Sequence, residues 1–373
     1  MHICFHTPFK PLGFPTPSGD LTIAEGLCGF LRRRGHRIWT VPSTRTRWIY
    51  WRPRRWFAVM RDGVRSIRYI RAHQPDVWLT YHAYYKSPDI LGPMVTRRTH
   101  LPYVIFQGMY STRRRKQLKT RPGFIWNRRS LDLAEHVFTN RRDDLINLRR
   151  LLPDDRVTYA RPGIYPEDFS FSPRARADLR DAWQVGDRCV IVSAAMFRPG
   201  VKTEGIRWVI RVCARLAGAG TPVRLVIAGD GRERENLQRF AHDILPGRVR
   251  FVGKIPRNRM HQFYSAGDVF AFPGIRESLG MVYLEAQSCG LPVAAFLNGG
   301  VPEVVRDRET GFLVPPFDME AYQTALNRLV TDDPLRRRMG RNARDYVRAH
   351  HDLNVNYGRV ETILSDIVRK RKA

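Results

Sequence analysis

Two glutamates in the second half of the chain have a spacing that suits a ligand site at the start of a helix. Glu277 and Glu285 are separated by seven residues, within the run 274-GIRESLGMVYLEAQSCGLP-292. In open α/β sheets, ligands bind beyond the carboxyl ends of the strands, where the first amides of a helix carry partial positive charge. Gly280 lets the backbone approach a ligand closely. The pattern therefore predicts a diphosphate at the helix start, with hydroxyl groups held by the two acids.

Each part of this run has an expected role. The helix would begin near Gly280, so the backbone amides that face the phosphates would be those of Leu279, Gly280, Met281 and Val282. Glu285, further along the helix, would accept hydrogen bonds from a ribose diol, and Glu277 would hold hydroxyls beyond the phosphates. A nucleotide-sugar carries all of these groups. The alternative is that both acids are solvent-facing charges at a helix end.

A diphosphate also needs cations. Arg198 and Lys202 follow a predicted strand in the run 193-SAAMFRPGVKTEG-205, so both could reach the same edge of the sheet. Because 64 of the 373 residues are lysine or arginine, ordinary solvated charge is an equally good explanation for this pair by itself.

The elements that would position these side chains alternate between strands and helices, which indicates parallel sheets covered on both faces. A proline-rich segment, 162–173, separates two such regions and is the expected hinge. The sequence thus predicts an α/β protein with two doubly wound domains that face each other across a cleft. The expected strands are 3–6, 37–41, 76–81 and 102–106, then 189–194, 223–229, 249–253, 268–272 and 292–296; the expected helices of the second half lie near 205–218, 233–243, 257–265 and 281–289.

The second half resembles the retaining GT-B glycosyltransferases of family 4, over roughly residues 190 to 350. The first half is similar more faintly, and the GT-B resemblance implies two Rossmann-like domains. Besides the two glutamates and the Arg198 and Lys202 loop, the runs that carry the likeness are 225-LVIAGDGRER-234, 249-VRFVGKIP-256 and 299-GGVPEVVRDRETGFLVPP-316, and more weakly 17-PSGD-20, 33-RRGHRIW-39 and 160-ARPGIYPEDF-169.

The resemblance implies a division of labour. An N-terminal domain, 1–168, would bind the acceptor, a C-terminal domain, 169–350, would bind the nucleotide-sugar, and a terminal helix, 351–373, would pack back on the N-terminal domain. Arg198, Lys202 and Glu277 would form the catalytic set: the cations stabilise the departing diphosphate, and Glu277 holds the donor sugar. The remaining donor contacts would be Glu285 at the ribose, Gly253, Lys254 and Ile255 at the base, and Gly19 near the phosphates.

No D-x-D run occurs in the chain, so the resemblance implies metal-independent transfer with no cofactor beyond a UDP- or GDP-sugar co-substrate. The chain departs from the family at Gln107, which stands where a histidine near the donor sugar is common. His82, in 81-YHAYY-85, is a candidate for the missing imidazole in the acceptor or sugar region; a packed or surface histidine is the alternative.

The net charge of +29 is concentrated in the first half, where residues 1–150 carry 29 lysines and arginines against 9 acids. An arginine-rich composition of the source organism is the plain alternative to a phosphate-bearing partner. In the run 45-RTRWIYWRPRRWFAVMR-61, aromatic residues are interleaved with arginines, a composition that suits an anionic membrane surface. The residues expected to contact the membrane are Trp48, Trp51, Arg52, Arg54, Arg55 and Trp56.

These features predict a cytoplasmic glycosyltransferase, peripheral on the inner face of the plasma membrane, that acts on a lipid-linked or membrane-proximal acceptor. The sequence lacks a signal-peptide core and an apolar run of about 20 residues. Five scattered cysteines form no C-x-x-C pair and indicate buried thiols. Two other classes stay open: a catalytically silent GT-B partner protein, and a nucleic-acid-binding protein, although no recognition motif for nucleic acid appears.

Overall fold

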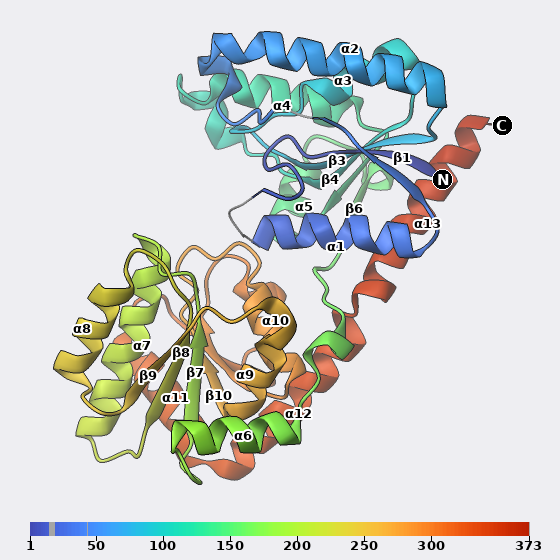
Figure 1. Cartoon of the computed structure of the whole chain (residues 1–373). Helices are drawn as coiled ribbons and strands as arrows, with labels where there is room; N and C mark the ends of the chain where they lie inside the picture. Colours follow the sequence, from blue (N-terminus) through green and yellow to red (C-terminus); the bar gives the residue numbers. More distant parts are fainter. Residues whose placement is uncertain (15–18, 43, 373) are drawn as a thin grey trace. The chain divides into compact units, whose positions relative to one another are not determined.

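The computed structural model describes residues 1–14, 19–42 and 44–372. The chain forms two α/β units: unit 1 comprises Met1–Pro162 and Asn354–Ala373, and unit 2 comprises Gly163–Leu353. Each unit is built on one six-stranded sheet (Figure 1). The first segment of unit 1 ends at Pro162, at the start of the predicted hinge. The sequence predicts this boundary later, after residue 168.

The sheet of unit 1 has the order β2-β1-β3-β4-β5-β6, with every neighbouring pair parallel. Its central strands β3 and β4 are buried at every position. The strand order reverses between β1 and β3. From β1 the chain continues to one side of the sheet, to β2, and from β3 it continues to the other side, to β4. The strands are β1 (His2–His6), β2 (Arg37–Thr40), β3 (Val77–Ala83), β4 (Tyr103–Gly108), β5 (His136–Thr139) and β6 (Val157–Tyr159); the last two had not been predicted.

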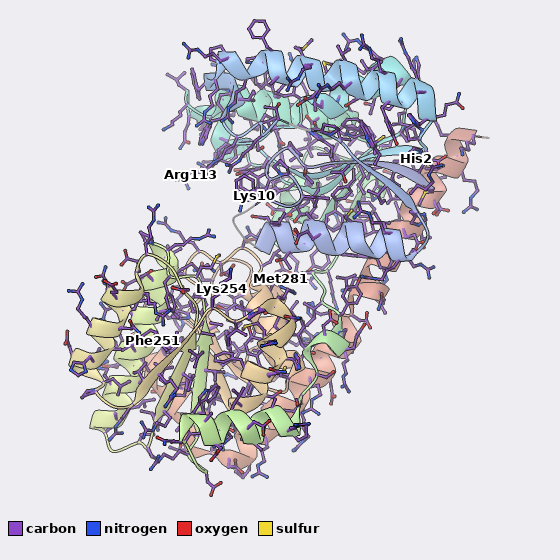
Figure 2. The ribbon with its side chains drawn as sticks, in the orientation of Figure 1. His2, Lys10, Arg113, Phe251, Lys254 and Met281 are labelled. Carbon is purple, nitrogen blue, oxygen red and sulfur yellow. The ribbon has the colours of Figure 1, made fainter. Side chains whose placement is uncertain are left out.

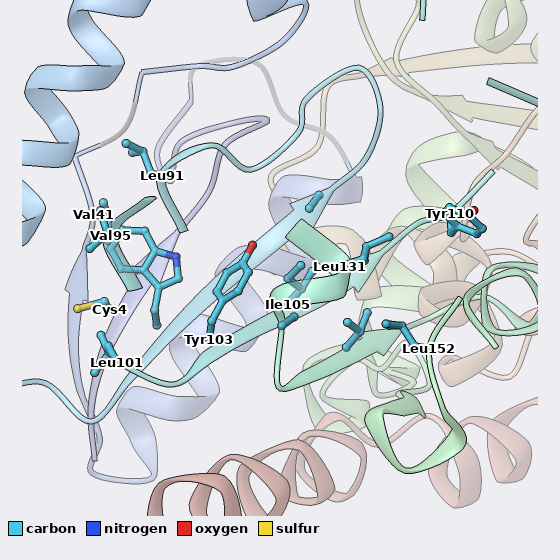
Figure 3. Close-up of a cluster of buried hydrophobic side chains, with 14 of the residues drawn as sticks. Cys4, Val41, Leu91, Val95, Leu101, Tyr103, Ile105, Tyr110, Leu131 and Leu152 are labelled. Carbon is cyan, nitrogen blue, oxygen red and sulfur yellow. The ribbon is translucent and has the colours of Figure 1, made fainter. Parts of the chain in front are cut away.

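The core of unit 1 lies between one face of this sheet and four helices. A cluster of buried side chains joins strand residues such as Cys4 and Tyr103 to helix residues such as Leu91 and Leu131 (Figure 3). These helices are α2 (Trp56–His73), α3 (Leu91–Thr99), α4 (Arg121–Leu133) and α5 (Arg142–Leu148).

The other face of the unit 1 sheet is covered by α1 (Gly19–Arg33) and the terminal helix α13 (Leu353–Lys372). The ring of Tyr357 lies 5.9 Å from that of Phe30 on α1 and 5.7 Å from that of Phe106 on β4. The ammonium of Lys372 lies 2.6 Å from the carboxylate of Asp76. The last helix therefore packs on unit 1, although it follows unit 2 in the sequence.

The sheet of unit 2 has the order β12-β11-β10-β7-β8-β9, also with parallel neighbours. The order reverses between β7 and β10, as in dinucleotide-binding sheets. The predicted α/β architecture with two Rossmann-like parallel sheets is thus confirmed. The strands are β7 (Val190–Ala194), β8 (Arg224–Ala228), β9 (Val249–Gly253), β10 (Val269–Ala271), β11 (Val293–Phe296) and β12 (Gly311–Val314).

The helices of unit 2 form two groups, which are joined by a contact between α11 and α12. In the first group, α7 contacts both α8 and α11; in the second, α9 contacts α6 and α10, and α10 contacts α12. The helices are α6 (Pro173–Trp183), α7 (Val201–Gly218), α8 (Arg234–Ile244), α9 (Met260–Ala266), α10 (Met281–Ser288), α11 (Met319–Thr331) and α12 (Asp333–His350).

In each unit, an aspartate with little exposed surface connects separate elements. In unit 2, the carboxylate of Asp268 lies 2.6 Å from Arg176 and 2.9 Å from Arg180, both on α6. In unit 1, Asp89 is fully buried and accepts hydrogen bonds from Tyr103 (2.8 Å) and from the amide of Gly92 (2.8 Å), at the start of α3. Burial raises the pKa of each carboxyl, but the charged and hydrogen-bonding partners outweigh it and hold each pKa below its ordinary value.

Among the residues that the structure describes, no helix combines the length and apolar character that crossing a bilayer requires.

Candidate active site

The strongest candidate site lies where the strand order of unit 2 reverses. Lys202 lies in the first turn of α7, after β7, and Glu277 lies in the loop after β10. Because the two strands are neighbours and the chain leaves them in opposite directions, the loops form the sides of a crevice at this edge. The Lys202 ammonium forms an ion pair with the Glu277 carboxylate and lies 5.2 Å from the centre of the Phe272 ring. The structure thus brings together two side chains that are 75 residues apart in sequence.

The Lys202 and Glu277 pair remains accessible to a ligand. The Lys202 side chain is 32% exposed and that of Glu277 is 14% exposed. A bound anion could therefore reach the ammonium without unfolding of the surrounding loops.

Glycines at two positions, Gly280 and Gly300, hold the loop that carries Glu277 in its conformation. Gly280 precedes α10 with φ +67°, a left-handed conformation that other residues rarely adopt. Gly300 donates its amide to the carbonyl of Glu277 at 3.0 Å, and a Cβ at this position would lie 1.7 Å from the carbonyl oxygen of Ser278. The glycines of the 299–300 run therefore have a packing role: they support the backbone that presents Glu277.

The start of α10 offers backbone donors. In the described part of the chain, the amides of Leu279, Gly280, Met281 and Val282 donate no backbone hydrogen bond, whereas the amide of Tyr283 donates to the Gly280 carbonyl at 2.9 Å. These four amides begin two residues after Glu277, so a phosphate near Lys202 would also meet the partial positive charge of a helix start. This is the position at which the sequence predicts a diphosphate.

The Arg198 loop is tied to neighbouring segments of unit 2. The amide of Phe197 donates to the carbonyl of Asp230 at 3.0 Å, and the amide of Glu233 donates to the carbonyl of Phe197 at 3.1 Å. The hydroxyl of Thr203 on α7 donates to the Arg198 carbonyl at 2.7 Å. The Gly-Asp-Gly turn after β8 therefore positions the loop of Arg198, and the side chain of Arg198 is half-buried.

Glu285 is the more buried of the two glutamates, with 4% of its surface exposed. Its carboxylate accepts a hydrogen bond from the Tyr264 hydroxyl at 3.1 Å and pairs with the Arg257 guanidinium at 2.8 Å. Burial raises the pKa of Glu285, and Arg257 opposes that rise. Both carboxylate oxygens thus have protein partners, and a ribose at this position would share or displace Arg257, which is half exposed.

Sequence reasoning missed Arg257 and Tyr264. Arg257 directly follows the predicted base-binding loop 253–256, which is the one signal that could have found it. This loop begins at the last residue of β9, Gly253, whose carbonyl accepts the Gly229 amide at 2.8 Å, and Lys254 is exposed. Figure 2 shows Lys254 and Met281 at the same end of unit 2.

A second cluster lies where the strand order of unit 1 reverses. His82 is near the end of β3, and its Nδ1 atom lies 3.3 Å from the carboxylate of Asp20, in the first turn of α1. Gln107, near the end of β4, also interacts with Asp20. Burial raises the pKa of Asp20, but His82, Lys10 and Gln107 together bring it below its ordinary value. Asp20 belongs to the quoted run 17–20, yet the sequence suggested no role for it.

Both His82 and Gln107 hold strained backbone conformations. Their φ angles are +64° and +62°, in the left-handed region that residues with a Cβ atom rarely adopt. Both side chains are buried, and the rings of Phe9 and Tyr84 lie 5.2 Å and 4.7 Å from the imidazole of His82. Such strain concentrates at functional sites, because the fold must maintain it at a cost.

Gly19 begins α1, and a Cβ there would meet no atom within 4 Å, so the structure of unit 1 gives no steric reason for a glycine. Pro17 and Ser18 of the same run lie outside the described residues.

The residues predicted to contact a membrane surround two short 3₁₀ helices, η1 (Ile49–Trp51) and η2 (Pro53–Arg55). Trp51 is 56% exposed, whereas Trp48 and Trp56 are half-buried. Trp48 lies beneath the ammonium groups of Lys86 and Lys119, and Trp56 packs edge to face on Trp126. Arg52 and Arg54 are exposed, and Arg55 donates to the Arg45 carbonyl at 3.2 Å.

The fold of the whole chain is the GT-B fold. It superimposes on HepE of Anabaena, crystallised in complex with UDP, with a TM-score of 0.76 at 18% identity, covering 98% of this chain and 100% of that one. WaaG, described as a glycosyltransferase involved in lipopolysaccharide biosynthesis, matches with a TM-score of 0.68 at 17% identity, covering 97% and 99% of the two chains.

Residues 186–346 match the model of the family described as glycosyl transferases group 1. A curated relative, the GDP-mannose-dependent alpha-(1-6)-phosphatidylinositol monomannoside mannosyltransferase of Mycolicibacterium smegmatis, is 33% identical over 59% of each chain. The D-inositol 3-phosphate glycosyltransferase of Acidothermus cellulolyticus is 31% identical over 65% of this chain and 54% of its own. The matches thus span little more than half the length of these relatives.

Proposed function

We propose that the protein is a retaining glycosyltransferase that moves a sugar from a UDP- or GDP-sugar to a lipid-linked acceptor. The observation that carries the proposal is the accessible pair of Lys202 and Glu277 at the strand-order reversal of unit 2, beside the unbonded amides that begin α10. This arrangement combines a cation, backbone donors and a hydroxyl-binding carboxylate in one crevice. Those are the groups that a sugar attached to a diphosphate requires.

In this reaction, the bond between the anomeric carbon and the diphosphate oxygen breaks, and the acceptor oxygen bonds to the same carbon. The negative charge that develops on the leaving diphosphate would be met by Lys202, Arg198 and the first amides of α10. Glu277 would release Lys202 to the phosphate and accept a hydroxyl of the sugar. The acceptor proton would pass to the departing phosphate, so no side chain needs to act as a covalent nucleophile.

The acceptor would bind to unit 1. Asp20, His82 and Gln107 offer hydrogen-bond donors and acceptors between the rings of Phe9 and Tyr84, a composition that suits a polyol. The relatives that act on phosphatidylinositol mannosides and inositol phosphate favour an inositol or sugar headgroup of this kind.

A membrane location for the acceptor is favoured by the concentration of cations in the first half of the chain. Among the predicted contacts, the side chains of Trp51, Arg52 and Arg54 are the exposed ones. We place the protein at the cytoplasmic face of the membrane as part of the same proposal.

The experiment that tests the proposal has two stages. Thermal unfolding is measured with GDP-mannose, UDP-glucose and ADP-glucose, because a ligand that binds the folded state raises the melting temperature. The donor that does so is then incubated with the protein and phosphatidylinositol, and the lipids are examined by mass spectrometry. A mass gain of one sugar supports the proposal.

Two results would contradict the proposed reaction. Stabilisation by no nucleotide-sugar would remove the donor site. If the same donor stabilised the wild type and Lys202→Met equally, the site would be misplaced. Arg338→Met is the matched control for the loss of an exposed cation in unit 2. Donor binding without transfer to any lipid headgroup would favour the silent GT-B partner.

A further inference from the structure

A hollow of about 550 Å³ lies in unit 1 between the start of α2, α3 and α4, away from the Asp20 and His82 cluster. This volume is in the range of pockets that hold small molecules. Its wall is apolar where Trp56 and Trp126 meet edge to face, with ring centres 5.1 Å apart. We call it the lipid groove; its lining comprises Trp56, Asp89, Ile90, Pro93, Met94, Arg97, Arg98, Trp126, Arg129, Ser130 and Leu133.

The lipid groove presents only positive charge to a ligand. Arg97, Arg98 and Arg129 are exposed, and in the part of the chain that the structure describes none of the three pairs with a carboxylate. The one acid in the lining, Asp89, is 1% exposed and is already held by Tyr103 and other buried partners. An anionic group with an apolar tail would match both the rim and the wall.

A second exposed apolar surface lies on α2, the helix whose first residue, Trp56, lines the groove. Phe57, Met60 and Val64 follow each other at helical spacing and are 83%, 48% and 46% exposed. The only acid of α2, Asp62, is buried and accepts a hydrogen bond from Thr44. The helix therefore exposes an apolar ridge with arginines beside it and no negative charge, which is the pattern of a helix that lies on an anionic bilayer. Its exposed arginines are Arg61, Arg65, Arg68 and Arg71.

We propose that the lipid groove takes up one acyl chain of an anionic phospholipid, with Arg97, Arg98 and Arg129 at the phosphate, while the outer face of α2 contacts the bilayer. The inference deepens the membrane association proposed above and rests on it, but it does not depend on the glycosyl transfer reaction. It assigns a lipid that is bound as a ligand and is not the acceptor at the Asp20 and His82 cluster.

The charge and the geometry of the groove favour a lipid over a nucleic acid. Single-stranded nucleic acid binds by stacking bases on accessible aromatic faces. Trp56 and Trp126 are half-buried and pack against each other, so they form a wall and do not offer free faces. An acyl chain requires only apolar surface, and each methylene that it buries strengthens binding about fourfold.

The test uses soluble lipids, so that ligand binding is separated from adsorption to a bilayer. Tryptophan fluorescence is followed while the full-length protein is titrated with dihexanoylphosphatidylglycerol below its micelle concentration. Glycerol 1-phosphate supplies the charge without the chains, and dihexanoylphosphatidylcholine supplies the chains without net charge. We expect saturable binding of the phosphatidylglycerol only, with affinity rising about fourfold for each added methylene that enters the groove.

Two variants connect the binding to the groove. Leu133→Trp places a larger side chain in the groove and should abolish the dependence on chain length. The triple variant R97Q/R98Q/R129Q should weaken binding to phosphatidylglycerol vesicles about one-hundredfold, at about fivefold for each cation. The matched control is R338Q/R341Q/R348Q, which removes three exposed arginines of α12 that form no ion pair with any described residue, and it should leave vesicle binding unchanged.

Several results would overturn the inference. Equal binding of glycerol 1-phosphate would show a simple anion site, and equal binding of the phosphatidylcholine would show that the arginines are irrelevant. Displacement of the phosphatidylglycerol by stoichiometric single-stranded DNA would indicate a nucleic-acid surface, and no binding would remove the site. Thermal shifts with nucleotide-sugars, measured on the same variants, report on the proposed reaction separately: they should not change when the groove is altered.

Discussion

The two units share a sheet topology and differ in the side chains that they place where the strand order reverses. Each has a six-stranded parallel sheet with one reversal of strand order, and each places a carboxylate beside a nitrogen group at that reversal. In unit 2, the pair of Lys202 and Glu277 is partly exposed, beside amides that begin a helix. In unit 1, His82 is buried in strained backbone beside Asp20. The comparison indicates that topology fixes where a candidate site lies, whereas the residues at the ends of the strands and at the starts of the helices fix its chemistry.

The largest effect is expected at the reversal of unit 2. Lys202→Met should lower turnover by about 10² to 10³, because it removes a charge aimed at the leaving diphosphate. Steady-state transfer to the lipid acceptor measures the loss, and circular dichroism checks the fold. Turnover close to that of Arg338→Met, which removes an exposed cation elsewhere in unit 2, would separate Lys202 from the chemistry.

Substitution of the aspartates that connect elements in each unit, Asp89 in unit 1 and Asp268 in unit 2, should lower the free energy of unfolding by different amounts. Asp89→Asn in unit 1 should cost about 3 kcal/mol at pH 7, because it leaves fully buried partners unmatched. Asp268→Asn should cost less, about 2 kcal/mol, because Arg176 is 30% exposed. Urea unfolding at pH 7 provides both values.

The pH dependence of these two variants has a definite sign. Each aspartate has a pKa below its ordinary value in the folded protein, so its contribution is present above about pH 4 and is lost as the pH falls through the folded value. The cost of each substitution should therefore shrink as the pH falls below about 4. A cost that stays constant over this range would show that the carboxylate charge is not what stabilises the unit.

The reversal of unit 1 should affect the acceptor and not the donor. His82→Ala should lower kcat/KM for the acceptor about 30-fold, which corresponds to the loss of a hydrogen bond of about 2 kcal/mol in a charged network. Donor-induced thermal shifts should be unchanged. Asp20→Asn should produce a smaller loss of the same kind, since Asp20 acts through His82. If donor binding changed, or if kcat/KM for the acceptor stayed normal, the Asp20 and His82 cluster would have a packing role and would not bind the acceptor.

The smallest effect is expected at Glu285. Arg257→Met removes the cation that opposes the raised pKa of this buried carboxyl. Since the folded pKa lies above the ordinary 4.5, the neutral acid is tolerated at low pH, and the substitution should cost little there. The cost should grow as the pH rises above 4.5 and reach only about 1 kcal/mol near pH 7, because Arg257 is half exposed and solvent screens the pair. Thermal unfolding from pH 4 to 7 follows it.

The secondary structure of the second half was predicted well because each of its signals lies within one short segment of the sequence. The run from Gly274 to Pro292 contains the strand exit, the glycines and the helix start in one segment. Five of the six strands of unit 2 were found to within two residues, since continuous apolar runs of this length form buried strands, whereas β12 (Gly311–Val314) was not predicted. Two strands of unit 1, His136–Thr139 and Val157–Tyr159, were missed because they are short and carry polar side chains.

The sequence alone determined the class of the fold, the loop that bears Glu277 and the cations that could meet it, because spacing along one segment decides these features. Only the tertiary structure decided that Arg257 pairs with Glu285, that Asp20 meets His82, and that three arginines from α3 and α4 surround one hollow. The physical reason is that such pairs depend on the order of strands in each sheet and on helix packing across it. Side chains far apart in the chain become neighbours only when those crossovers are made.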